Sequence, residues 1–270
     1  MTEQPEPQEE SPVLTAIEDG VLTITLNRPD RHNAVTGRMH REFHEALAIA
    51  NDNPAVRVVV LRGAGRSFCS GADVRDFVPP SPPPSPAQRA MDVMGGRDLV
   101  EAMLAVKQPI VAAVRGYSMG LGATIALFSD VVIASETAIF ADTHVNIGVV
   151  AGDGGAVMWP LLAGLGRARY HLLTGERVTG ALAAEWGLVY KVVPDGELET
   201  ESDAVIATLA GLAPMALRGT KATLNRIVRQ QVELVLEYGL WAEAVTFLSE
   251  DHTEATTAFA QKRRPSFSDR

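Results

Sequence analysis

The stretch from residue 109 to 155 constrains the fold more than any other part of the 270-residue chain. The apolar strand Ile110–Val114 runs into a glycine-punctuated turn, Gly116–Gly122, which opens a helix. At a helix start the backbone N–H groups have no intrahelical partner, and glycine lets a ligand atom approach them closely. His144 and Asp153 follow among apolar and glycine residues. Free N–H donors beside a histidine and an aspartate predict a site that stabilises an oxyanion and moves a proton.

Hydrophobic periodicity predicts an α/β protein, with strands and helices up to about residue 199 and helices alone after it. Alternation around Asp19-Gly20 predicts a β-hairpin. The loose repetition of strand and helix favours a stacked ββα spiral or another α/β layer. The expected strands are Leu14–Glu18, Val21–Leu26, Val56–Arg62, Ile110–Val114, Val131–Ala134, Ala138–Phe140 and Leu188–Val193, and helices are expected near 39–50, 87–106, 121–127, 154–162 and 179–186.

Three regions are expected along the chain. Residues 1–12 are acidic and Pro-rich, which is typical of a disordered tail. Residues 13–199 are expected to form the core with the active site, and residues 200–270 an appended helical region. The amphipathic helices of that region need a partner surface, for which another subunit is the candidate. Pro79–Pro86, PPSPPPSP, predicts an exposed polyproline II segment.

Composition excludes several classes of protein. A net charge of −9 disfavours general binding to nucleic acid or to an anionic membrane surface. A single cysteine, Cys69, excludes an internal disulfide and fits a reducing compartment. The acidic N-terminus is unlike a targeting peptide, and no run of about 18 apolar residues is present, so we expect a cytoplasmic protein. His40 and His44 lie four residues apart without a third ligand, so they predict a solvated helix face and no metal site.

Two motifs leave alternatives open. Gly116-x-Ser118-x-Gly120 matches the nucleophile elbow of serine hydrolases, but that fold needs the histidine last, and here His144 precedes Asp153. A turn that needs small residues explains Ser118 equally well. His144 is either a satisfied structural histidine or half of a functional pair, in which Asp153 accepts the Nδ1–H of the imidazole and fixes its tautomer.

Basic residues occur in three separated parts of this acidic chain. Each alone is typical of surface charge, but brought together by the fold they suit a multiply phosphorylated ligand. These residues are Arg28, Arg31, Arg66, Arg75, Lys262, Arg263 and Arg264.

Taken together, these segments make the chain resemble the enoyl-CoA hydratase/isomerase (crotonase) superfamily from about Leu14 to Phe267. The resemblance implies a ββα spiral core, a C-terminal helical trimerisation region, and a homotrimer or a dimer of trimers. It is carried by LNRPDRHNAV at 26–35, RSFCSGADV at 66–74, AAVRGYSMGLGATIAL at 112–127, IFADTHVNIGVVAGDGGAVMWPLL at 139–162, LLTGERVTGALAAEWGLVYKVVP at 172–194 and AFAQKRRPSF at 258–267.

The resemblance also implies a site. The family's oxyanion hole for a thioester enolate corresponds to the backbone N–H groups of Ala72 and Leu121. Coenzyme A would be part of the substrate, and no separate cofactor is implied. The implied substrate-binding positions are Arg28, Arg31, Ala34, Arg66, Ser70, Asp73, Arg75 and Thr124, with Phe259 and Lys262 contributed by a neighbouring subunit.

The chain departs from the family at its catalytic carboxylates. Hydratases of this family use two glutamates, and those positions here hold Thr124 and His144. Three readings follow. The favoured one is a hydratase/isomerase-like enzyme acting on an acyl-CoA without the usual glutamates. The second is a carbon–carbon bond hydrolase of β-diketones that uses His144 and Asp153, similar to 6-oxocamphor hydrolase. The third is a catalytically weakened binding or scaffold subunit.

Overall fold

The computed structural model describes residues 10–77 and 85–268, without the side chains of residues 76, 77 and 86–94. Most of the expected disordered tail, and residues 79–84 of the expected polyproline segment, lie outside the described residues. Pro86 begins a helix instead of ending that segment.

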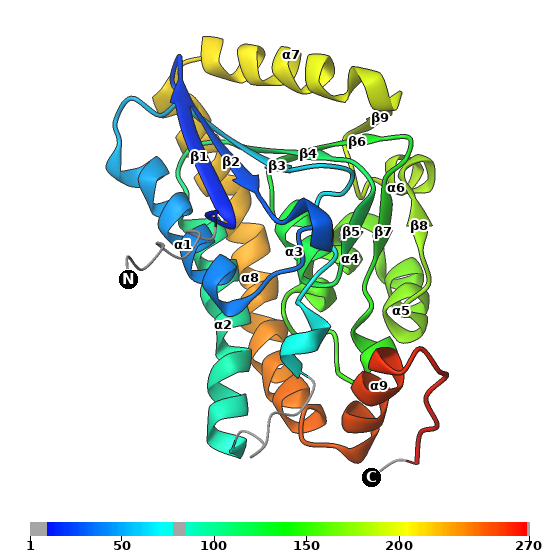
Figure 1. Ribbon diagram of the computed structural model, residues 1–270. Coiled ribbons are helices and arrows are strands. Elements are labelled where there is room, and N and C mark those ends of the chain that lie inside the picture. The colour runs from blue at the N-terminus through cyan, green and yellow to red at the C-terminus, as the bar shows by residue number, and fades with distance from the viewer. Residues whose placement is uncertain (1–9, 78–84, 269–270) are drawn as a thin grey trace, which may run out of the picture.

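The described residues form a main sheet and a smaller second sheet (Figure 1). In the main sheet β1 (Val13–Glu18) and β2 (Val21–Leu26) pair antiparallel around Asp19-Gly20, where both residues have positive φ, and the remaining neighbours are parallel. The predicted hairpin is therefore confirmed. The main sheet has the order β1 (Val13–Glu18), β2 (Val21–Leu26), β3 (Val58–Gly63), β4 (Ile110–Val114), β6 (Val131–Ser135), β9 (Lys191–Val193), and the second has the order β5 (Tyr117–Met119), β7 (Ile139–Ala141), β8 (Val178–Thr179).

Helices cover both faces of the main sheet. Helix α7 (Leu198–Gly211) lies across one face, where Leu198 and Ile206 pack on Val58 and Val60 of β3. The alternate residues of β3, including Val59 and Leu61, face the larger core on the other side. Both faces of the central strands are thus buried, which explains their uninterrupted apolar runs. The helices are α1 (Gly37–Asp52), α2 (Pro86–Ala105), α3 (Leu121–Leu127), α4 (Gly155–Ala163), α5 (Leu165–Thr174), α6 (Gly180–Trp186), α7 (Leu198–Gly211), α8 (Pro214–Thr246) and α9 (Glu250–Ala260).

The chain passes repeatedly from the main sheet to the second sheet. β4 leads through Gly116 into β5, and β6 leads into β7, which pairs parallel with β5. A short 3-10 helix, η3 (His144–Ile147), follows β7 directly. Because β5 and β7 are parallel neighbours, the start of α3, which follows β5, lies beside η3, which follows β7. The mixed α/β architecture agrees with the sequence prediction.

Within residues 198–268 the structure contains helices and connecting loops but no strand, as predicted. The long helix α8 has two apolar faces. Leu236 and Leu240 are buried in the main core, whereas Leu234 and Trp241 are exposed. The helical end thus shares the core of the rest of the chain. None of the helices among the described residues is long and apolar enough to cross a bilayer.

Candidate active site

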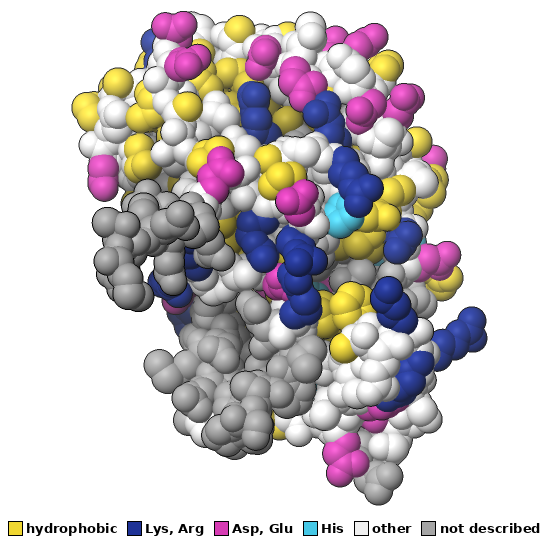
Figure 2. Space-filling view, viewed as in Figure 1, with side chains coloured by type: hydrophobic (Ala, Val, Ile, Leu, Met, Phe, Trp, Pro, Cys, Tyr) yellow, Lys and Arg dark blue, Asp and Glu magenta, His cyan; other side chains and the backbone are white. Residues whose placement is uncertain are grey.

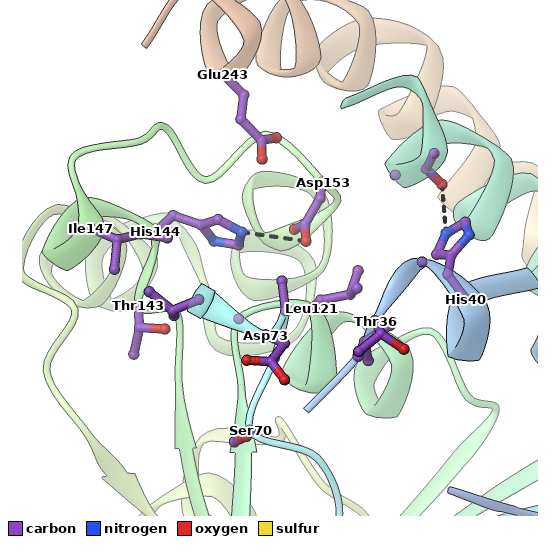
Figure 3. Close-up of a pocket in the computed structure, with 18 of the residues that line it drawn as sticks. Thr36, His40, Ser70, Asp73, Leu121, Thr143, His144, Ile147, Asp153 and Glu243 are labelled. Atoms are coloured by element: carbon purple, nitrogen blue, oxygen red, sulfur yellow. Dashed lines mark hydrogen bonds and ion pairs between the residues drawn. The ribbon is translucent and has the colours of Figure 1, made fainter. Parts of the chain in front are cut away.

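A cavity of about 490 Å³ lies where α1, the loop after β3, the start of α3 and η3 come together. Ile147, Phe247 and Val35 give it apolar walls, and His144, Asp153 and Glu243 add ionisable groups (Figure 3). Its lining also includes Thr36, Gly37, His40, Arg41, Ser70, Gly71, Ala72, Asp73, Val74, Gly95, Gly96, Gly120, Leu121 and Thr143.

The two glycine loops singled out in the sequence meet at this cavity. Isolated bridges pair Cys69 with Ser118 and Val35 with Ala72. Gly71 has a φ of +92°, and a Cβ added there would lie 2.8 Å from the carbonyl oxygen of Met119 and 3.7 Å from the nitrogen of Leu121. Only glycine fits this approach, and it brings the backbone of residues 71–72 next to the start of α3.

Both candidate N–H donors are unused. The bridge at Val35 employs the carbonyl of Gly71 and the N–H of Asp73, and so passes over the N–H of Ala72. Leu121 is the first residue of α3, where the N–H has no intrahelical acceptor. Among the described residues neither N–H has a hydrogen-bond partner. Ala72 and Leu121 therefore present two free backbone donors in one cavity.

His144 is held from both sides by carboxylates. Its Nδ1 lies 2.6 Å from Oδ1 of Asp142. Its Nε2 lies 3.4 Å from Oδ2 of Asp153, the contact drawn as a dashed line in Figure 3. The prediction that Asp153 accepts the Nδ1–H is wrong. Asp142 accepts it instead, because Asp142 follows the last residue of β7 and stands two positions before His144. Its Oδ1 also accepts the backbone N–H of His144 at 3.3 Å. Asp153 instead faces the other ring nitrogen.

The charges of this cluster stabilise one another. Burial works to lower the pKa of His144, but Asp142 and Asp153 outweigh it and hold that pKa well above 6.5. Burial works to raise the pKa of Asp153, but His144 and a hydrogen bond from the Thr124 hydroxyl, at 3.1 Å, hold it below 3.8. At neutral pH the site therefore contains an imidazolium between carboxylates.

Glu243 is a site residue that the sequence analysis missed. It projects from α8 toward His144 and Asp153, is 5 % exposed, and its Oε2 is buried without a hydrogen-bond partner among the described residues (Figure 3). Burial is the main reason that its pKa rises to about 8; Asp153 and Asp142 add to the rise and His144 opposes it. The signal was present in the sequence, because Leu236, Leu240 and Glu243 share one helix face.

Several predicted substrate-binding residues contact one another at the edge of the cavity. Nη1 of Arg28 donates to the carbonyl oxygen of Ala34 and to Oδ2 of Asp73, the latter at 3.2 Å. Arg75 donates to the same carboxylate at 2.6 Å. Although burial opposes it, these two arginines hold the pKa of Asp73 below its usual value.

The other predicted binding residues lie on the surface or behind the cavity. Arg66 contacts His32 at 3.0 Å, and Arg31 is exposed on a 3-10 turn. Phe259 and Lys262 are exposed near the end of α9. Figure 2 shows a band of Lys and Arg side chains on the face of the molecule that is also viewed in Figure 1, although the net charge of the chain is −9. Thr124 supports Asp153 from behind, and Ser70 lines the cavity.

Two minor expectations from the sequence can now be judged. Ser118 is fully buried, donates to the carbonyl of Gly122 at 3.2 Å and does not line the cavity, which excludes the alternative of a serine nucleophile and agrees with a turn that needs small residues. The solvated face predicted for His40 is wrong, because α2 packs over it and the Gly95 carbonyl lies 3.1 Å from its ring. Among the described residues no group of three or more His, Cys, Asp or Glu side chains forms a metal site.

Comparison with known proteins identifies the family. Residues 16–270 match the family model described as enoyl-CoA hydratase/isomerase. The chain belongs to this family. A crystal structure of an enoyl-CoA hydratase from Mycobacterium avium subsp. paratuberculosis K-10 superposes with a TM-score of 0.86 and 34% identity, over 96% of this chain and 99% of that one. This similarity confirms the crotonase fold.

Curated relatives of the enoyl-CoA hydratase/isomerase family have different activities. A 1,2-epoxyphenylacetyl-CoA isomerase of Escherichia coli K12 is 31% identical over 255 residues, which cover 94% of this chain and 97% of the relative. An (E)-benzylidenesuccinyl-CoA hydratase of Thauera aromatica is 33% identical, covering 95% of this chain and 98% of the relative. The names of both relatives describe reactions of CoA esters, one an isomerisation and the other a hydration.

Proposed function

We propose that this protein is an enzyme that binds an acyl-CoA thioester, stabilises its enolate on the N–H groups of Ala72 and Leu121, and moves a proton with His144. The observation that carries the proposal is the meeting of two free backbone donors and an imidazole in one cavity. The names of the relatives support a CoA ester as the substrate.

The proposed oxyanion hole uses backbone donors because they need no rearrangement as charge develops. A thioester oxygen between Ala72 and Leu121 would gain charge as the enolate forms, and two fixed N–H dipoles stabilise that charge. Removal of one such donor in other enzymes costs about 10²- to 10³-fold in rate. The imidazole lies close to the start of α3, since a Cβ added to Gly120 would be 3.7 Å from Cε1 of His144.

The proposed proton carrier is the Nε2 of His144. Asp142 binds Nδ1 tightly, whereas the 3.4 Å separation from Asp153 leaves Nε2 the nitrogen more open to substrate. Because the pKa of His144 is raised, its resting form is a proton donor suited to protonating an enolate carbon. Asp142 would keep the ring oriented while Nε2 gives up its proton.

The sharpest test changes one backbone donor alone. Proline is tolerated at the first residue of a helix, and Leu121→Pro removes the N–H there with a fixed φ that suits α3. We expect this variant to lose about 10²- to 10³-fold in kcat/KM on a panel of enoyl- and acyl-CoA esters. Leu121→Ala is the matched control, because it shortens the side chain and keeps the donor. Equal activity of both variants, or no binding of any CoA ester to the wild type by calorimetry, would contradict the proposal.

A second candidate is hydrolysis of a carbon–carbon bond in a β-diketone. It is favoured by one observation: the ionised carboxylates beside the cavity are paired with an imidazole, as in an acid–base unit built on histidine. Cleavage of a cyclic β-diketone without CoA would favour this candidate. Full retention of that cleavage in His144→Ala would exclude the role assigned to the imidazole.

A further inference from the structure

The carboxyl group of Glu243 occupies a place made for it by two glycines. α8 approaches the loop before α4 so closely that a Cβ on Gly239 would lie 3.2 Å from Cα of Gly152. Glu243 lies one turn of α8 after Gly239, and a Cβ on Gly152 would lie 2.6 Å from its Oε2. The backbone contact therefore seats this carboxyl group beside the segment that carries Asp153, at the wall of the cavity.

A structural role does not account for this carboxyl group. Buried polar atoms in folded proteins are almost always hydrogen-bonded, yet Oε2 has no partner among the described residues. No ion pair with a lysine or arginine is found for Glu243 in the described part of the chain. Oε2 itself is buried against Gly152, but Glu243 lines the cavity, so its carboxyl group, which has no side-chain partner among the described residues, faces a ligand bound there.

The surroundings decide what kind of ligand atom it would meet. With a pKa of about 8, Glu243 is an uncharged acid at neutral pH and can donate an O–H hydrogen bond. Its ionisable neighbours are His144 on η3, Asp142 at the end of β7 and Asp153 before α4. An imidazolium nearby disfavours a cationic ligand group, and two carboxylates disfavour an anionic one, so a neutral oxygen acceptor fits best.

We propose that Glu243 binds a ketone or hydroxyl oxygen on the acyl group of the substrate, so that the enzyme prefers oxygenated acyl-CoA esters to plain alkyl ones. This inference rests on the proposed function, because it places the acyl group in the same cavity. Glu243 is then the specificity-determining residue, and the apolar Ile147 and Phe247 contact the remaining carbons of the acyl group.

The test compares ligands within one protein. Dissociation constants for hexanoyl-CoA, 3-oxohexanoyl-CoA and 5-oxohexanoyl-CoA are measured by calorimetry on the wild type, Glu243→Gln and Glu243→Leu. We expect the wild type to bind one oxo ester about tenfold more tightly than hexanoyl-CoA. Glu243→Gln keeps a neutral donor and retains that ratio within about threefold, whereas Glu243→Leu loses it. The ratio is independent of any common loss of stability, and Glu243→Met replaces the leucine variant if that one does not fold.

The outcomes separate this inference from the function on which it rests. Equal binding of all three esters by the wild type overturns the preference and leaves the proposed function intact. An oxo preference that survives in Glu243→Leu shows that another group reads the oxygen. Failure of the wild type to bind any of the three esters overturns the proposed function and this inference together.

Discussion

Asp142 accepts the Nδ1–H of His144 at 2.6 Å, although only Thr143 separates the two residues in the chain. Asp142 is 1 % exposed, its Oδ1 contacts the ring and the backbone N–H of His144, and its second oxygen has no hydrogen-bond partner among the described residues. This contact sets the orientation of the ring and, with Asp153, its protonation state.

The first prediction concerns Asp142→Asn. The amide keeps the size of the side chain and removes the charge, so the pKa of His144 should fall toward its ordinary value. We expect kcat at neutral pH to fall about 10²-fold, and the alkaline limb of the pH profile to move to lower pH, because the proton donor is lost earlier. NMR titration of His144 together with the pH profile measures both effects. Asp203→Asn, a change at an exposed ion pair with Arg62, is the control and should leave both unchanged. An unmoved pH limb would refute the role given to Asp142.

The second prediction concerns Gly71→Ala. The added Cβ would meet the Met119 carbonyl at 2.8 Å on a backbone with φ of +92°, so residues 71–72 must shift away from α3. We expect a loss of about 10²-fold in kcat/KM, and of about 1–3 kcal/mol in the free energy of unfolding. Enzyme assay and urea unfolding give the two numbers. Gly219→Ala, inside α8, is the matched control: among the described residues nothing lies within 4 Å of its added Cβ, and alanine there should stabilise slightly. Wild-type turnover by Gly71→Ala would argue against an oxyanion hole at this place.

The third prediction concerns stability against pH. The pKa of Glu243 rises from 4.5 to about 8 in the folded protein, so between these values the folded state holds a proton that the unfolded state has released. Its contribution to stability is therefore complete below about pH 4.5 and is lost as the pH rises through about 8. The free energy of unfolding of the wild type, relative to Glu243→Gln, should fall by up to about 1.4 kcal/mol per pH unit in this window. Urea unfolding at several pH values measures the difference, and parallel curves for the two proteins would contradict it.

The fourth prediction concerns the outer face of α8, which we propose as a contact between copies of this chain. Leu234 is 74 % exposed and Trp241 is 62 % exposed, and a large exposed apolar face is typical of an interface. The double variant Leu234→Glu and Trp241→Glu should lower the mass measured by light scattering to that of a monomer. Leu173→Glu on α5 changes an equally exposed leucine and should leave the mass unchanged. A wild type that is already monomeric would rule out this interface.

The sequence by itself determined the elements and where the two glycine loops lie. β4 was predicted with its observed bounds, and the hairpin at Asp19-Gly20 followed from local turn chemistry. These features depend on residues close together in the chain, for which periodicity and positive φ are sufficient signals. The sequence motifs shared with the family also predicted the crotonase fold. Helix α5 and the short strands β5 and β8 were missed, and β5 lies inside the segment predicted as the turn Gly116–Gly122. β9 begins at Lys191 instead of Leu188.

Only the tertiary structure decided which side chains meet. Asp142 and Asp153 are both plausible partners of His144 in the sequence, but the turn after β7 places Asp142 against Nδ1 of the imidazole. Glu243 enters the site from a helix that begins 61 residues after Asp153, at Pro214, because Gly152 and Gly239 let two backbones touch. The apolar residues of α8 look alike along the chain, yet packing buries some and exposes others. The physical reason is that periodicity describes the faces of an element, whereas the neighbour of each face is set by contacts between distant segments.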